Sequence, residues 1–381
     1  FSGVLVFPML AVIGILFAVS AVPIQVQFGK LSRTLTDWKS KLGVVASVLA
    51  GSALLSFLLL WTCYGWRHSM TPDPKMSAGI NWDRLGPSDS FVADAVRWGR
   101  EAHLLPEAFA YGFLQTQEST ATRSAFLMGE YSTEGWWYYF LVTFAVKTPI
   151  PLLLLIVLAA VFIKRFGAGW LAEATLLVPV AVYAVFALTS NLNIGHRHLL
   201  PIYPFLIVFA AKTARALDFN RQRVLAAACA LLLAWNVFEA AKTYPHFLSY
   251  FNQFAGGSAN GYEWLVDSNL DWGQDLKALA QYRQAHPEEP FFLSYFGSAR
   301  PEFYGIKGRF LPSFNPGNKR RTLEPFSAVQ SGATVAVSAT GLQCANIRNQ
   351  DAPGVEQFMA RLRNLQPIAV IGHSIFIYRM P

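Results

Sequence analysis

A chain of 381 residues in which 53% are hydrophobic and only 14% are charged is too apolar for an ordinary soluble protein. A formal net charge of +8 would suggest a nucleic-acid partner in a soluble protein. Here the lysines and arginines gather in short segments between apolar runs, so the composition predicts an integral membrane protein whose charge reports orientation, with no nucleic-acid partner.

Apolar runs long enough to cross a bilayer, about 20 residues each, occur about six times. We therefore expect a polytopic α-helical membrane protein with about six transmembrane helices within residues 1–243. The basic segments between the runs all fall on one side under this count, which predicts a cytoplasmic side. They contain Lys30, Arg33, Lys39, Lys41, Lys164, Arg165, Lys212, Arg215, Arg221 and Arg223. The candidate spans are residues 3–26, 44–64, 150–163, 171–189, 199–211 and 224–240.

Residues 67–135 form a polar segment that we expect to be an ordered outer loop. Helical periodicity over residues 90–103 and 106–117 favours a loop that lies on the membrane surface. The aromatic run that follows predicts an interfacial helix over residues 136–147.

The stretch Asn191-Leu-Asn-Ile-Gly-His-Arg-His-Leu-Leu-Pro-Ile-Tyr-Pro204 places two imidazoles and a guanidinium between two apolar runs. His196, Arg197 and His198 are therefore candidates for holding an anion such as a lipid phosphate at the outer membrane surface. Lys147, which precedes a span on its outer side, is a further candidate for the same phosphate. The alternative for these cations is that they snorkel to lipid headgroups or cap helix ends.

From residue 244 to 381 the composition becomes that of a soluble domain, which predicts a C-terminal α/β domain on the outer face. Strands are expected over residues 291–295, 333–338 and 374–378, and helices over 276–284 and 355–365. His246, just beyond the last span, is either a further cation at the phosphate site or a plain surface histidine.

The densest polar cluster of the chain is Asp267-Ser-Asn-Leu-Asp-Trp-Gly-Gln-Asp275. A calcium loop is disfavoured because its glycine is one place late and Ala278 stands where a bidentate glutamate is needed. A capping box formed by Asp271 and Gln274 at the start of the helix accounts for more of the pattern. Asp267 and Asn269 then remain as residues that hold the soluble domain against the membrane face.

Glu130 and Glu134 lie just ahead of the interfacial helix, where a carboxylate either orients an acceptor or simply pairs with a base. No cofactor is indicated, although a divalent metal remains possible. Cys63, Cys229 and Cys344 show no metal-ligand spacing and form one disulfide at most. The familiar phosphate-loop, dinucleotide-binding and nucleophile-elbow motifs do not occur.

Five motifs that occur in order along most of the chain carry a family resemblance. They are Gly129-Glu-Tyr-Ser-Thr-Glu-Gly-Trp-Trp-Tyr-Tyr-Phe, Lys147-Thr-Pro-Ile-Pro, His196-Arg-His-Leu-Leu-Pro-Ile-Tyr-Pro, Tyr250-Phe-Asn-Gln-Phe-Ala-Gly-Gly and Asp267-Ser-Asn-Leu-Asp-Trp-Gly-Gln-Asp. Together they resemble the C-terminal half of bacterial GT-C membrane glycosyltransferases, and more narrowly the protein O-mannosyltransferase-like members of glycosyltransferase family 39.

The resemblance implies a multi-pass enzyme of the bacterial cytoplasmic (inner) membrane. Such an enzyme takes a sugar from a polyprenyl-phosphate donor and places it on an acceptor at the outer face. In that family the general base is an aspartate in an outer loop near the N-terminus, so we expect the catalytic aspartate to lie outside these residues.

Two other functions compete with glycosyl transfer. The chain could be a non-catalytic membrane subunit that binds lipid or acts as a scaffold in a larger complex. A transporter is less compatible with the sequence, because its charges gather near the ends of the apolar runs instead of near their middle.

Overall fold

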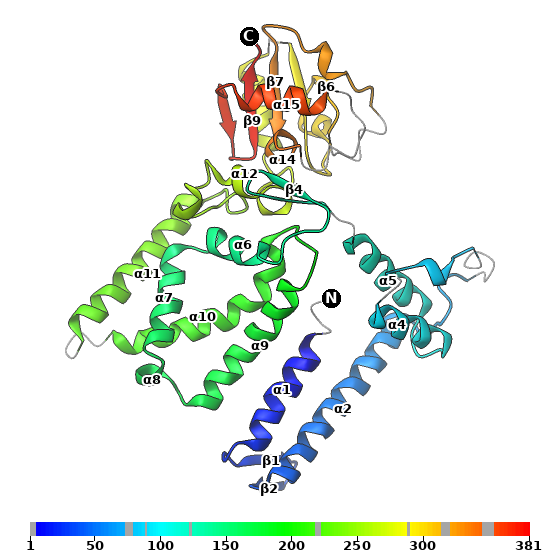
Figure 1. Cartoon of the computed structure of the whole chain (residues 1–381), viewed down its shortest axis with the longest axis vertical. Helices are drawn as coiled ribbons and strands as arrows, with labels where there is room; N and C mark the ends of the chain where they lie inside the picture. Colours follow the sequence, from blue (N-terminus) through cyan, green and yellow to red (C-terminus); the bar gives the residue numbers. More distant parts are fainter. Residues whose placement is uncertain are drawn as a thin grey trace. The chain divides into compact units, whose positions relative to one another are not determined.

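The computed structural model describes residues 5–72, 79–87, 90–121, 124–217, 222–287, 290–313, 321–344 and 354–381. Contacts between Cα atoms divide the chain into two compact units. The first comprises Phe1–Arg123, Gly167–Leu192 and Pro204–Phe209, and the second comprises Ser124–Phe166, Asn193–Tyr203 and Ala210–Pro381. Arg221 of the basic segments and parts of the predicted outer loop lie outside the described residues. Figure 1 shows the helices and strands by label.

The first unit contains a helical hairpin with a small sheet at its turn. The elements are α1 (Val6–Val19), β1 (Ile24–Phe28), β2 (Leu31–Leu35) and α2 (Trp38–Cys63), and β1 pairs with β2 in antiparallel register. Asp37 begins α2 by accepting a hydrogen bond from the Ser40 backbone N–H at 2.8 Å. The predicted span 3–26 was thus wrong at its end, because the helix stops at Val19 and residues from Ile24 onward form a strand.

A buried lysine joins the two helices of this hairpin. Lys41 has no exposed surface, and its ammonium group donates hydrogen bonds of 2.7 Å to the carbonyl oxygens of Ser20 and Val22. Those carbonyls follow the last turn of α1, where a helix lacks internal partners for its C=O groups. Lys41 therefore contributes a bond between α1 and α2 in addition to any effect of its charge on orientation.

The predicted helices of the outer loop are present in the same unit. They are α4 (Phe91–Glu101) and α5 (Glu107–Ala121), preceded by the short 3-10 helix η2 (Trp82–Arg84). Their apolar faces meet in a small core of Ala93, Val96, Ala110 and Leu114. The unit also contains α9 (Trp170–Leu188), which packs against α1.

The second unit begins with the β3 and β4 hairpin and continues through helices that carry the candidate site. The strands are Ala125–Leu127 and Glu130–Ser132, paired antiparallel. The helices are α6 (Tyr139–Lys147), α7 (Ile150–Val161), α8 (Ile163–Phe166), η3 (His196–Ile202), η4 (Lys212–Ala216) and α11 (Arg223–Thr243). Between η3 and η4 runs α10 (Tyr203–Ala211), whose residues are divided between the units.

The same unit ends in a five-stranded mixed sheet with the order β6-β5-β7-β9-β8. β5 runs parallel to β6 and β7, whereas β9 is antiparallel to β7 and β8. The strands are β5 (Phe291–Ser294), β6 (Arg309–Phe310), β7 (Thr334–Ser338), β8 (Ala369–Ile371) and β9 (Ile375–Arg379). The expected sheet near the C-terminus is therefore present, although β6 and β8 were not expected.

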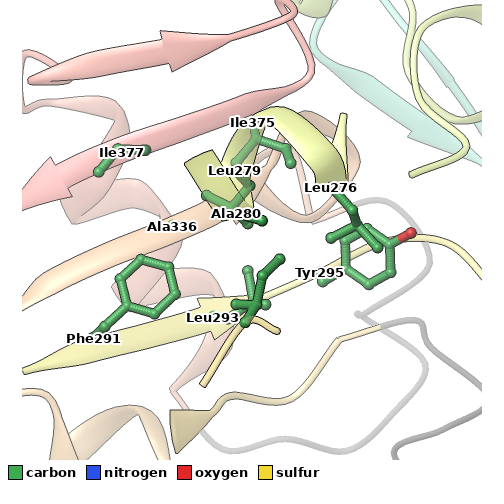
Figure 2. Close-up of a cluster of buried hydrophobic side chains, with 10 residues drawn as sticks. Leu276, Leu279, Ala280, Phe291, Leu293, Tyr295, Ala336, Ile375 and Ile377 are labelled. Carbon is green, nitrogen blue, oxygen red and sulfur yellow. The ribbon is translucent and has the colours of Figure 1, made fainter. Parts of the chain in front are cut away.

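The core of this sheet lies against helix α13 (Leu276–Ala285), which was also predicted. Figure 2 shows Leu276, Leu279 and Ala280 of α13 beside alternate residues of β5, β7 and β9. Burying each large aliphatic side chain contributes about 1.5–3 kcal/mol. A second predicted helix, α15 (Val355–Arg363), buries Phe358, Met359 and Leu362. β7 is buried at all five positions, so both of its faces are covered.

The described part of the chain contains four helices that are long and apolar enough to cross a membrane. They correspond to α2, α9, the continuous segment His196–Ala216 and α11. Helices α6 and α7 pass the same test as a pair that bends by 109°, which gives up to five, and α1 is a shorter apolar helix. These features are those of a multi-pass membrane protein. The sequence prediction of about six spans is higher because it counted the segment of α1 as a span and the segment of α7 as a span without α6.

Candidate functional site

Asn269 connects three of the segments that contain predicted site residues. Its side-chain Nδ2 donates to the Tyr139 hydroxyl at 2.8 Å, and its Oδ1 accepts the His196 backbone N–H at 2.7 Å. Its own carbonyl oxygen accepts a 2.6 Å bond from Lys147 Nζ. Asn269 is only 1% exposed, so these bonds form away from water. Helices α6 and η3 are thereby held to the Asp267–Asn269 turn, η6.

Lys147 ends α6 with its ammonium group held by backbone carbonyls. Besides Asn269, Nζ donates to the Leu248 carbonyl at 2.8 Å, and it lies 4.2 Å from the centre of the Phe251 ring. An ammonium group has three N–H donors, so two of them are already engaged. Lys147 Nζ thus lies beside η3 and η6, with at most one donor left for a ligand.

His196 lies at the start of η3 in a chain of side-chain hydrogen bonds. Its Nε2 is 2.8 Å from the Tyr203 hydroxyl, which in turn bonds the Thr148 hydroxyl. The other ring nitrogen, Nδ1, is buried and has no hydrogen-bond partner among the described residues. When Tyr203 donates to Nε2, neutral His196 carries its proton on Nδ1. An acceptor arriving at Nδ1 would complete the hydrogen bonding of the ring.

Arg197, the next residue, differs from its neighbours in being exposed. Its guanidinium carbon lies 5.9 Å from the centre of the Trp272 ring, and no ion pair to it is found within the described ranges. The His198 ring packs edge-on against Phe140 of α6, with ring centres 6.5 Å apart. The predicted triad therefore divides into a buried imidazole, an exposed guanidinium and an imidazole packed on an aromatic ring.

The close approach of η3 to η6 explains two features of the sequence. A Cβ atom on Gly195 would lie 3.0 Å from Ser268 Cβ, which is closer than side chains normally pack, so glycine lets the two backbones meet. Asp267 adopts a left-handed backbone conformation, with φ of 58°. Its Oδ1 accepts hydrogen bonds from the backbone N–H and hydroxyl of Ser268, a local bonding pattern that makes this conformation accessible to aspartate.

Asp271 is fully buried beside this turn and does not cap a helix. Its Oδ1 accepts the Gly273 N–H at 2.8 Å, and Oδ2 has no hydrogen-bond partner of normal geometry among the described residues. Burial raises the pKa of Asp271 to about 8, and Asp275 and Asp267 add to the rise. The Gly273 N–H and the nearby Ser338 hydroxyl oppose it.

The predicted capping box was wrong. Helix α13 begins after Asp275, whose side chain makes no capping bond to the helix. Gln274 instead bonds the Leu270 carbonyl and the Asp275 carboxylate, each at 3.1 Å. The glycine turn at Gly273, with φ of 76°, puts the helix start later than the spacing of Asp271 and Gln274 implied.

Glu130 and Glu134 are both exposed and remain apart from this cluster. Glu130 lies on β4, and the Glu134 backbone N–H bonds the Ser132 hydroxyl at 3.1 Å. Neither carboxylate forms an ion pair with a basic residue in the part of the chain that the structure describes. The expected pairing with Lys147, His196 or Arg197 is therefore not found there.

Within the described residues, no group of three or more His, Cys, Asp or Glu side chains is arranged to hold a metal ion. Cys63, Cys229 and Cys344 are all free thiols. The possible disulfide is therefore not formed between them.

Reasoning from the sequence did not identify the aromatic and hydroxyl partners of the site. Tyr139, Thr148 and Tyr203 lie within the motifs that were singled out, but nothing in their spacing shows that they bond Asn269 and His196. These contacts join residues as many as 130 positions apart, so only the folded chain reveals them.

Comparison with protein-family models, curated proteins and solved structures found no match to this chain.

Proposed function

We propose that this chain belongs to a membrane glycosyltransferase of the GT-C type. It would transfer a sugar from a polyprenyl-phosphate donor to an acceptor at the outer face of a bacterial inner membrane. Two observations support the proposal, both at the start of the apolar segment His196–Ala216: the Arg197 guanidinium is exposed, and the buried Nδ1 of the preceding residue, His196, has no hydrogen-bond partner among the described residues. Phosphate oxygens would supply the acceptors that both groups lack.

The chemistry needs stabilisation of a leaving phosphate. When the bond between the sugar and the phosphate breaks, negative charge grows on the phosphate oxygens. Arg197 would contact those oxygens directly and His196 would donate from Nδ1. Lys147 would contribute at most one further hydrogen bond, because two of its donors are engaged by backbone carbonyls.

A membrane scaffold without catalytic activity is the alternative function. The observation that favours it is that Lys147, His196 and Asn269 already bond one another's segments, which is the pattern of a structural connection. In that case the exposed Arg197 would bind lipid headgroups at the membrane surface.

Transfer activity, measured with the protein in membranes of its own host cells, separates the two functions. We expect Arg197→Ala to lower transfer from a polyprenyl-phosphate sugar by roughly 100-fold, as loss of a charged contact to a developing anion would. Arg361→Ala, an exposed arginine of α15, is the matched control and should retain full turnover. Undiminished transfer by the Arg197 variant would remove this residue from the mechanism, and inactive wild type would favour the scaffold.

A further inference from the structure

A cavity of about 540 Å³ with both polar and apolar lining opens where α11 joins the soluble part of the second unit. Its volume lies within the range of roughly 300–1,000 Å³ that small-molecule sites occupy. The residues that line it and matter here are Glu239, Lys242, His246, Tyr250, Phe251 and His373. The proposed phosphate site uses different side chains.

Glu239 is a buried carboxylate in the largely apolar helix α11. It is 5% exposed, and its Oε1 accepts hydrogen bonds from Trp235 Nε1 at 3.0 Å and Gln253 Nε2 at 2.6 Å. The second oxygen, Oε2, has no bond to any described residue. A carboxylate fixed through one oxygen and open at the other is well suited to accept a hydrogen bond from a ligand hydroxyl.

Tyr250 and the two histidines add further hydrogen-bonding capacity to the cavity wall. The Tyr250 hydroxyl is buried without a partner among the described residues, and burial together with Glu239 raises the pKa of Tyr250, so it remains a protonated donor. His246 is oriented by Asp275, with Nδ1 to Oδ1 at 3.4 Å, and Ser374 donates to the same carboxylate at 2.6 Å. Burial and His246 lower the pKa of His373, which favours its neutral form.

The charges restrict the kind of ligand that fits. An anion would approach the carboxylate of Glu239, and an apolar molecule would leave the buried Tyr250 hydroxyl unsatisfied. A cation would approach the ammonium group of Lys242. A neutral ligand with several hydroxyl groups can meet the acceptors and the donors together, while its carbon-bound face packs on the Phe251 ring.

We propose that this cavity binds a neutral, hydroxyl-rich ligand of the sugar class, held by Glu239, Tyr250 and His246. The proposal rests on the proposed function in one respect, because a glycosyl acceptor would need such a site near the transfer reaction. Binding of the sugar itself involves no bond making or breaking. It can therefore be measured without any transfer assay.

Saturation-transfer NMR on the full chain in nanodiscs provides the test, with glucose, galactose, mannose and N-acetylglucosamine as probes. We expect at least one of them to receive saturation from the protein. Glu239→Gln should weaken that sugar's binding roughly tenfold, because a charged acceptor toward the ligand becomes an amide donor while Oε1 still serves Trp235. Tyr250→Phe should weaken it as well, with little risk to folding. Glu263→Gln, an exposed glutamate of α12 (Gly261–Trp264), is the control and should bind like wild type.

Three results would overturn the proposal. They are the absence of signal for every probe with folded wild-type protein, equal binding by wild type and both cavity variants, and displacement of the sugar by inorganic phosphate. The last would show an anion site in place of a sugar site. None of these results depends on transfer activity, so an inactive transferase with normal sugar binding would refute the proposed function alone.

Discussion

Asn269 is the residue on which most of the candidate site depends. Its side chain serves Tyr139 and His196 at once, and the buried position excludes water as a substitute partner. An unpaired buried polar group costs about 1–3 kcal/mol. The site is therefore as sensitive to this amide as to any of the charged residues in it.

We expect Asn269→Ala to lower the free energy of unfolding by about 2–4 kcal/mol, because both bonding partners would lose their acceptor or donor. The apparent melting temperature of the detergent-purified chain would report the change. Asn364→Ala, at the exposed C-terminal end of α15, is the matched control and should melt like wild type. Equal melting of the two variants would mean that Asn269 does not hold the segments together.

Asp271 should make the folded chain less stable as pH rises, which is the opposite of what most carboxylates do. Its pKa in the folded chain is raised to about 8, whereas an unfolded chain has a pKa of about 3.9. Between these two values the folded state holds more protons, so the contribution of Asp271 to stability is largest at low pH and falls as pH rises toward 8. Above pH 8 no further loss is expected from this group.

The corresponding prediction is that Asp271→Asn removes part of this slope. Melting temperatures measured from pH 5 to pH 8 should fall less steeply in the variant than in wild type, because a neutral amide replaces a carboxyl group that must ionise in a buried place. Identical slopes would show that Asp271 is not protonated in the folded chain.

At the scale of helices and strands, most elements follow from sequence patterns. The apolar runs predict α2, α9 and α11 to within several residues at each end, and short runs rich in aromatic or β-branched residues predict β5, β7 and β9. Burial of a continuous apolar surface determines these elements, and that information is local. The same reasoning extended the first span too far, although Pro23 and the alternation of Ile24, Val26 and Phe28 with glutamines indicate a strand.

The hydrogen-bond partners of Lys41 and Lys147 could not be predicted in this way. Lys41 and Lys147 have the sequence context of cations at a membrane boundary, yet each donates to two backbone carbonyls. For Lys147 these carbonyls are 101 and 122 residues away along the chain. Which carbonyls lack partners depends on how the helices end and meet, and no local pattern records that.

Lys147 is consequently predicted to stabilise the junction of α6 with the segment that follows α11. Lys147→Met keeps the length of the side chain but removes its donors, leaving two buried carbonyls unsatisfied. We expect a loss of about 2–4 kcal/mol in unfolding free energy, measured by denaturant titration in mild detergent. Lys164→Met, an exposed lysine of α8, should have little effect. If both variants unfold alike, the role of Lys147 is limited to its charge.

At the scale of the whole molecule, the proposed function requires one orientation in the membrane. The segment around Lys39 should lie in the cytoplasm and the α/β domain outside, as the distribution of basic residues predicts. In a chain with Cys63→Ser, a membrane-impermeant maleimide should label Glu356→Cys in intact cells and Lys39→Cys only after permeabilisation. Both positions are exposed, and the remaining cysteines are buried. Reversed labelling would contradict the assignment of the outer face.

The phosphate-binding role of the Arg197 turn is the central claim, and affinity for polyprenyl phosphate tests it most directly. The measurement compares wild type, Arg197→Gln and the control Arg361→Gln in nanodiscs of neutral lipid, with polyprenol as the ligand that lacks phosphate. We expect Arg197→Gln to weaken binding of polyprenyl phosphate by at least roughly tenfold, while the Arg361→Gln control binds it like wild type. All three proteins should bind polyprenol, which lacks the phosphate, with the same affinity. Equal affinity of all three proteins for polyprenyl phosphate would contradict the central claim.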